Sequence, residues 1–138
     1  MTPETEKRLE IEIKKSYYSA QRYQELSTFA MLYHPSNLPV DTIGNMVRLS
    51  DQIIKIDAHH YFIVFNYTTH EQAFRAAENL LLELDNYFNN RESCIGLDSF
   101  NPKQSPTIVI HRLTQILEEV RKNEFLRVED ENILNEIV

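Results

Sequence analysis

The sequence predicts an α+β sandwich of the ferredoxin-like type, in which helices pack on one largely antiparallel sheet. Two observations lead to this class. Apolar runs typical of strands alternate with amphipathic runs typical of helices along the chain. Two strand-like runs, QIIKI at 52–56 and YFIVFNY at 61–67, are separated by only a short break, so we expect them to form a central hairpin.

Length and composition fit one ordinary domain. The chain has 138 residues, 42% of them hydrophobic and 25% charged, as in typical globular proteins. The net charge of −7 opposes nucleic acid binding. Two glycines are too few for a glycine-rich phosphate loop. With no signal peptide, no apolar run of roughly 20 residues and a single cysteine, the sequence predicts a cytoplasmic protein without a membrane partner.

The first half is expected to hold two helices and a strand before the hairpin. Thr2-Pro3 is typical of a helix start, and the acidic residues that follow suit the positive end of the helix dipole. Pro35 ends an apolar run of strand-forming residues. The expected elements are a helix over 3–23, a buried strand over 26–34 and a short helix near 39–47.

The second half has stronger local signals. Thr69 and Gln72 form a capping box ahead of an amphipathic helix, and Ser105-Pro106 begins another. Strands are expected over 93–100 and, more briefly, over 124–128. We therefore predict a single domain over 1–128, followed by an acidic tail over 129–138 that forms a helix packed on the domain or on a partner.

Three stretches of the chain carry a family resemblance. They are KRLEIEIKKSYYSAQRYQELSTFAMLYH, SCIGLDSF and HRLTQILEEVRKNEFLRV. In order and spacing they resemble the first helix and strand, a later strand, and the last helix and strand of the GGDEF domain of diguanylate cyclases. The resemblance extends along almost the whole chain, and it implies a nucleotide-cyclase-like sandwich.

The hairpin IKIDAHHYFIVF is similar to the RxGGDEF hairpin of that family, but its turn is degenerate. In the family, two glycines let the backbone approach the nucleotide, and an acidic side chain helps to hold a divalent metal ion. This chain has neither feature. Glycine is needed because a Cβ atom would crowd the nucleotide, and carboxylates are needed because magnesium prefers hard oxygen ligands. The residues at the positions of Gly, Gly, Asp or Glu, Glu and Phe are Asp57, Ala58, His59, His60 and Tyr61.

The end of the first strand departs from the family in the same way. Tyr33, His34 and Pro35 stand where the resemblance implies metal-binding aspartates. The following segment is also shorter than in the family and lacks a counterpart of the guanine-binding residues. The resemblance therefore implies a protein that is not an enzyme and needs no cofactor.

One family feature is retained. Arg48-Leu49-Ser50-Asp51 matches an RxxD motif that, in many diguanylate cyclases, lies five residues before the turn and binds the product cyclic di-GMP. Arginine can donate two parallel hydrogen bonds to a phosphate or a guanine edge, and aspartate can accept from guanine. The site would be completed by Arg22, by Arg75 or by a second subunit. The alternative is local: Arg48 ends a helix and Asp51 caps the next turn.

Other reactive residues of the sequence lack a recognisable site motif. His34, His59 and His60 would have to converge to hold zinc, but no HxH or HExxH spacing supports a site, so no metal is expected. Cys94 lies in an apolar strand and is expected to be inert. The acidic pairs Glu118-Glu119 and Asp130-Glu131 are expected on solvated helix surface, with no chemical role.

The resemblance and its departures imply two alternative functions, both in signalling. The first is a catalytically inactive domain that binds cyclic di-GMP through Arg48 and Asp51. The second is a protein-interaction or dimerisation module that binds no nucleotide. In both cases the partners are a small ligand, a signalling protein or a second copy of the chain, and not nucleic acid.

Overall fold

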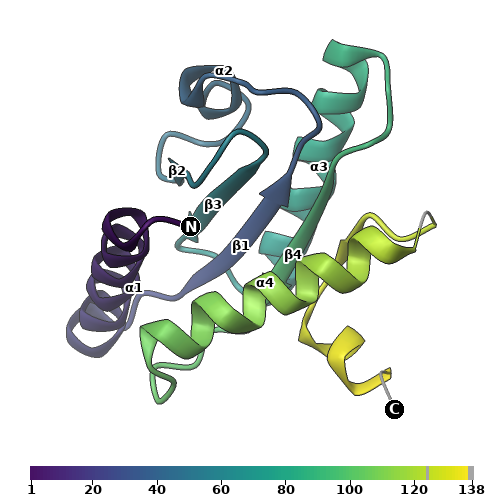
Figure 1. Cartoon of the computed structure of the whole chain (residues 1–138). Helices are drawn as coiled ribbons and strands as arrows, with labels where there is room; N and C mark the ends of the chain where they lie inside the picture. Colours follow the sequence, from purple (N-terminus) through teal and green to yellow (C-terminus); the bar gives the residue numbers. More distant parts are fainter. Residues whose placement is uncertain (124, 137–138) are drawn as a thin grey trace.

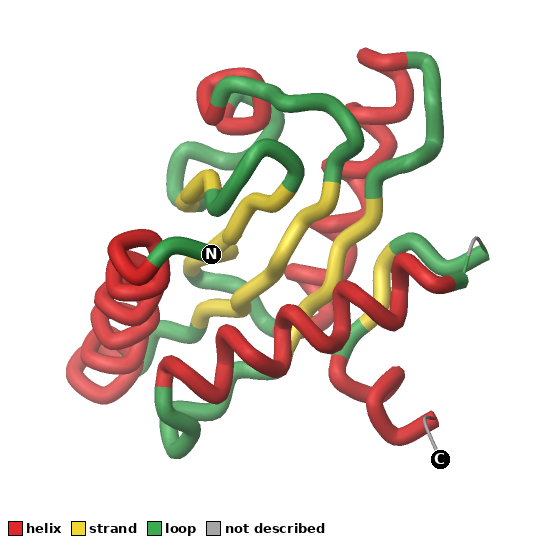
Figure 2. Tube along the Cα trace, viewed as in Figure 1, coloured by secondary structure: helices red, strands yellow, loops and turns green. Residues whose placement is uncertain are grey.

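The computed structural model describes residues 1–123 and 125–136 as a five-stranded sheet with helices on both faces (Figures 1 and 2). The strand order is β2-β3-β1-β4-β5; all neighbours are antiparallel except β4 and β5, which are parallel. The predicted α+β class is confirmed. The elements are α1 (Pro3–Tyr23), β1 (Ser27–Tyr33), α2 (Val40–Gly44), β2 (Gln52–Lys55), β3 (His60–Asn66), α3 (His70–Phe88), β4 (Cys94–Asp98), α4 (Pro106–Lys122), β5 (Val128–Glu129) and the 3-10 helix η1 (Glu131–Glu136).

The central strand β1 separates two apolar layers. Successive side chains of a strand point to opposite faces of the sheet. Phe29 and Met31 therefore pack with α1 and α4, whereas Ala30 and Leu32 pack with α3. In Figure 1, α4 crosses in front of the sheet and α3 lies behind it. Because both faces are covered, β1 is buried along almost its whole length, as the apolar run predicted.

Side-chain caps fix the starts of the three long helices where the sequence predicted them. The hydroxyl groups of Thr2 and Ser105 each accept a hydrogen bond from a backbone N–H in the first turn of the helix that follows. At α3, Thr69 and Gln72 form both bonds of the capping box. These contacts satisfy N–H groups that have no partner within the helix. Within the described residues, no helix is both long and apolar enough to cross a membrane.

The sheet brings the end of β1 beside the starts of β3 and β4. Tyr33 lies opposite His60 on one side and Cys94 on the other. The predicted hairpin of β2 and β3 is confirmed, and the Ile56 N–H donates to the His60 carbonyl oxygen at 2.8 Å. The β2–β3 turn therefore lies at the same sheet edge as the residues that follow β1.

The C-terminal segment differs from the sequence-based expectation. A strand was predicted over 124–128, but β5 forms at Val128–Glu129 beside β4, and Glu124 lies outside the described residues. Residues 131–136 form a short 3-10 helix whose Ile133 is 7% exposed and belongs to the core around α4. Residues 137–138 lie outside the described residues.

Asp130-Glu131 was wrongly predicted to lie on solvated helix surface. Asp130 precedes η1, and its side chain is only 16% exposed because it turns toward the start of α3.

Candidate functional site

The β2–β3 turn is held by its own side chains. Asp57 Oδ1 accepts a hydrogen bond from the His59 backbone N–H at 2.9 Å and lies 2.8 Å from His60 Nδ1. Partial burial raises the pKa of Asp57, but the hydrogen bonds from His59 and His60 and the charge of His60 outweigh it and hold the pKa below its usual value. The turn's one carboxylate is thus ionised and already bonded within the turn.

The final turn residue is a structural anchor. Tyr61 is fully buried, and its hydroxyl group donates to the Leu38 carbonyl oxygen at 2.8 Å and accepts from the Leu38 N–H at 3.0 Å. This pair of bonds fixes the segment between β1 and α2 against β3. A phenylalanine would fill the same space but would leave the Leu38 N–H without its partner.

His34, directly after β1, is buried rather than exposed. Its Nδ1 lies 2.6 Å from Ser93 Oγ, and its ring packs against Phe88 with the centroids 4.8 Å apart. Burial lowers the pKa of His34; nearby Glu92 opposes this effect and His59 adds to it. A neutral imidazole at physiological pH follows.

The Nδ1 atoms of the three histidines at this edge face three different partners. His59 Nδ1 faces the His34 carbonyl oxygen at 3.2 Å, His34 Nδ1 faces Ser93, and His60 Nδ1 faces Asp57. Each ring is thus oriented by a different neighbour. Among the described residues, these three rings do not form a group whose ligand atoms converge on one point.

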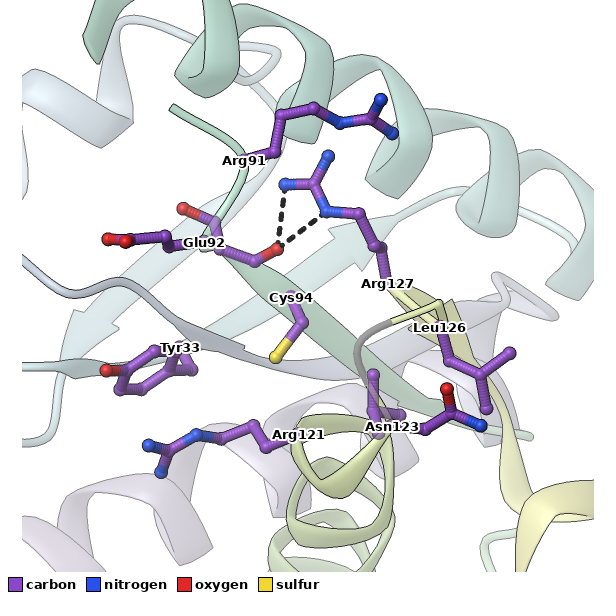
Figure 3. Close-up of a pocket in the computed structure, with 10 residues that line it drawn as sticks. Tyr33, Arg91, Glu92, Cys94, Arg121, Asn123, Leu126 and Arg127 are labelled. Carbon is purple, nitrogen blue, oxygen red and sulfur yellow. Dashed lines mark hydrogen bonds between the residues drawn. The ribbon is translucent and has the colours of Figure 1, made fainter. Parts of the chain in front are cut away.

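An open pocket of about 310 Å³ lies at the ends of β1 and α4 (Figure 3). Its Tyr33 ring lies near the His59 and His60 rings of the turn. Arg121 lies over the Tyr33 ring, with its guanidinium carbon 3.6 Å from the ring centroid. Arg127 is held by the Ser93 carbonyl oxygen and by both oxygens of Asp85. These arginines give the pocket a basic side in an acidic protein.

Cys94 lines the same pocket but is not set up for chemistry. Burial raises the pKa of its thiol to about 11, although Arg121 and Arg127 act in the opposite direction. The thiol is therefore protonated at neutral pH, and a protonated thiol is a poor nucleophile. The geometry agrees with the expectation of an inert cysteine.

The Arg48-Asp51 motif forms a closed turn before β2. The Asp51 N–H donates to the Arg48 carbonyl oxygen at 3.0 Å, and the Arg48 N–H donates back to Asp51 Oδ2 at 3.1 Å. The guanidinium group donates to both carboxylate oxygens, at 3.1 and 2.6 Å. The side chain of Asp51 is 1% exposed, whereas the side chain of Arg48 is 49% exposed.

Asn66, at the end of β3, supports this turn and was missed by the sequence analysis. Its carbonyl oxygen accepts from Arg48 at 2.8 Å, and its side-chain amide donates to the Ser50 carbonyl oxygen at 2.7 Å. Leu49 at the corner is fully exposed beside an open pocket of about 300 Å³ between α2 and β2. No local signal marks Asn66, because the contact joins segments brought together only by the hairpin.

The two groups of residues singled out from the sequence lie at opposite ends of β2. The Arg48-Asp51 turn precedes this strand, and the Asp57–Tyr61 turn follows it. At about 3.3 Å per strand residue, β2 holds them roughly 13 Å apart or more. They are two separate sites on one hairpin. Among the described residues, Asp51 forms its ion pair with Arg48 and not with Arg22 or Arg75; Arg75 pairs with Glu71 on α3.

Solved structures that contain GGDEF domains share this architecture. No protein-family model and no curated protein matches the sequence. Among solved structures, the GGDEF domain of DgcB from Caulobacter crescentus, in complex with c-di-GMP, superposes with a TM-score of 0.72 at 13% identity, over 91% of this chain and 90% of that one. The diguanylate cyclase SiaD from Pseudomonas aeruginosa, in complex with its activator SiaC, gives 0.70 at 12% identity, over 90% and 56%.

A third similar structure comprises only the GGDEF domain of TpbB (YfiN) from Pseudomonas aeruginosa. It gives a TM-score of 0.66 at 12% identity, over 93% of this chain and 91% of that one. The chain therefore has a GGDEF-like fold, as the resemblance of its segments predicted. At these identities the likeness establishes the fold, whereas the chemistry depends on this chain's own residues.

Proposed function

We propose that this chain is a catalytically inactive GGDEF-like signalling domain that acts by binding. The observation that carries the proposal is the chemistry of the sheet edge where the resemblance implies a metal and nucleotide site. His34 there is buried and neutral, and Asp57 is bonded to His59 and His60. Magnesium prefers several hard oxygen ligands, and the β2–β3 turn offers one carboxylate, which is already engaged.

The loss of activity can be tested directly. Incubation of the purified chain with GTP and Mg²⁺ is expected to yield no cyclic di-GMP above the protein-free blank, as measured by chromatography. His60→Ala serves as the control, because any real turnover at this edge has to respond to a change in the turn. Product that forms with the original chain and is lost in His60→Ala would contradict the proposal.

The ligand that we propose is cyclic di-GMP, bound by the guanidinium group of Arg48. Asp51 and Asn66 hold its guanidinium group half exposed at a protein surface, so that one face of a rigid, permanently charged group meets solvent. An oriented arginine is well suited to a phosphate or a guanine edge, because less conformational freedom is lost on binding. Since both oxygens of Asp51 already accept from Arg48, we assign Asp51 a positioning role.

Calorimetric titration of cyclic di-GMP into the chain tests this assignment. We expect saturable binding that Arg48→Ala weakens at least tenfold, because the charged donor is removed. Arg91→Ala is the matched control: Arg91 is exposed ahead of β4 and makes only a long surface ion pair with Asp85, so its loss should leave binding unchanged. Equal binding by Arg48→Ala, or no heat from a folded sample, would overturn the ligand assignment.

A protein-interaction module is the second candidate, and the closure of the same motif favours it. Asp51 is buried with its bonding capacity used by Arg48, while Leu49 projects fully exposed from the turn. Leu49 lines the open pocket between α2 and β2 together with Val47 and Ile53, and apolar side chains gathered in this way are what a protein contact uses. If cyclic di-GMP gives no heat, a mass that rises with concentration in sedimentation would identify self-association as the activity.

A further inference from the structure

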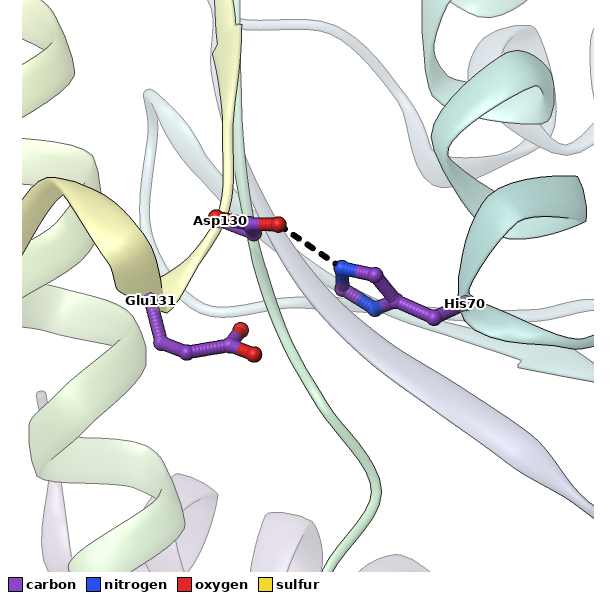
Figure 4. A group of neighbouring side chains, drawn as sticks. All are labelled: His70, Asp130 and Glu131. Atoms are coloured by element: carbon purple, nitrogen blue, oxygen red, sulfur yellow. Dashed lines mark hydrogen bonds and ion pairs between the residues drawn. The ribbon is translucent and has the colours of Figure 1, made fainter.

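Three metal-ligating side chains converge at the start of α3, away from the sheet edge described above (Figure 4). His70 is the first residue of α3, and Asp130 and Glu131 follow β5, 60 residues later in the chain. One ligand atom from each lies within 4.8 Å of the others, and all three residues are partly buried. The His70 Nε2 atom lies 2.9 Å from Asp130 Oδ2.

Neighbouring groups orient both carboxylates. Asp130 Oδ1 accepts from the Asn132 N–H at 3.0 Å, which leaves Oδ2 turned toward His70. Glu131 accepts from the backbone N–H of Ser99 at 3.0 Å and from its hydroxyl group. Outer hydrogen bonds of this kind hold ligands in place in metal sites. An oxygen atom that accepts one such bond keeps a lone pair for a cation.

The imidazole of His70 faces the carboxylate of Asp130 through its Nε2 atom. Among the described residues, its second nitrogen, Nδ1 of His70, is buried without a hydrogen-bond partner. A direct His70–Asp130 hydrogen bond engages Nε2, and Glu131 is bonded to Ser99. A cation bound to the three groups would neutralise the two carboxylates that converge on the imidazole.

We propose that His70, Asp130 and Glu131 bind a divalent transition-metal ion of the zinc class. One imidazole nitrogen and two carboxylate oxygens are ligands that zinc accepts, whereas magnesium disfavours the nitrogen. Two carboxylates also supply charge to neutralise the ion. With bonds of about 2.0–2.2 Å, tetrahedral ligand atoms lie roughly 3.4 Å apart, so small side-chain rotations close the present spacing. A water molecule completes the four positions.

The bound ion would cross-link two segments that lie far apart in the sequence. Asp130 and Glu131 connect β5 to η1, and η1 packs on α4. The ion therefore ties this C-terminal segment to the start of α3. Since an unfolded chain has no such preformed site, metal binding stabilises the folded state.

The test is calorimetric titration of ZnCl₂ into the EDTA-treated full chain at neutral pH. We expect one saturable site, and at least tenfold weaker binding in both His70→Ala and Asp130→Asn. Asp130→Asn keeps the shape of the side chain and can still bond to His70, so it separates loss of a ligand from loss of the fold. Circular dichroism confirms that each variant is folded, and zinc should raise the Tm of the original chain.

Two controls locate the site. His111→Ala removes an exposed histidine of α4 and should leave binding unchanged, because that imidazole lies outside the group. His59→Ala tests the alternative cluster at the β2–β3 turn and should also have no effect. Unchanged zinc affinity in His70→Ala, loss of binding in His59→Ala, or the absence of saturable heat would each overturn the proposal.

Discussion

Tyr61 shows how one residue of a degenerate turn acquires a structural role. It stands where the family resemblance implies phenylalanine, yet its hydroxyl group both donates to and accepts from the backbone of Leu38. The carbonyl oxygen of Leu38 has a second donor in Lys55, whereas its N–H has only the tyrosine. Removal of the Tyr61 hydroxyl group would therefore leave mainly this buried N–H group without a hydrogen-bond partner.

Tyr61→Phe is expected to lower the free energy of unfolding by about 1–3 kcal/mol, the typical cost of a buried donor left without a partner. Urea denaturation followed by circular dichroism measures this change. Tyr18→Phe is the control, because Tyr18 is 57% exposed on α1 and should change stability by less than about 0.5 kcal/mol. Equal stability of Tyr61→Phe and the original chain would show that water replaces the lost contact.

At the scale of elements, the sequence predicted best what is decided locally. The capping box of Thr69 and Gln72, the Thr2-Pro3 start and the buried apolar run of β1 depend on neighbours in the chain, and each appears as predicted. β5 was placed too early because a two-residue strand is defined by its pairing with β4 rather than by its own residues.

The same limit explains what could be predicted of the sites. Arg48 and Asp51 were found because their spacing is local, but Asn66, which also holds Arg48, comes from another strand. The proximity of His70 and Asp130 arises only when β5 joins the sheet. Asp130-Glu131 was predicted to be a solvated pair because acidic neighbours usually are, and nothing within the segment reveals a histidine 60 residues away.

At the scale of the whole molecule, His34 connects several elements through one buried ring. It follows β1, faces Ser93 before β4, and packs on Phe88 at the end of α3. Burial lowers its pKa from the ordinary 6.5, and the opposing effect of Glu92 does not cancel this. The unfolded chain therefore binds a proton near pH 6.5 that the folded chain does not bind. By linkage, His34 makes the folded state lose stability as the pH falls below 6.5 toward the folded pKa.

We expect the free energy of unfolding of the original chain to fall between pH 7 and pH 5 with a His34 contribution of at most about 1.4 kcal/mol per pH unit. His34→Asn cannot titrate, so its stability, although lower overall, should change less steeply over this interval. His111→Ala removes an exposed histidine and should keep the original slope. Urea denaturation at several pH values gives these slopes. Parallel curves for the original chain and His34→Asn would contradict this prediction. They would mean that the buried ring takes up its proton without opening the sheet edge, so that His34 does not couple the stability of β1, β4 and α3 to pH.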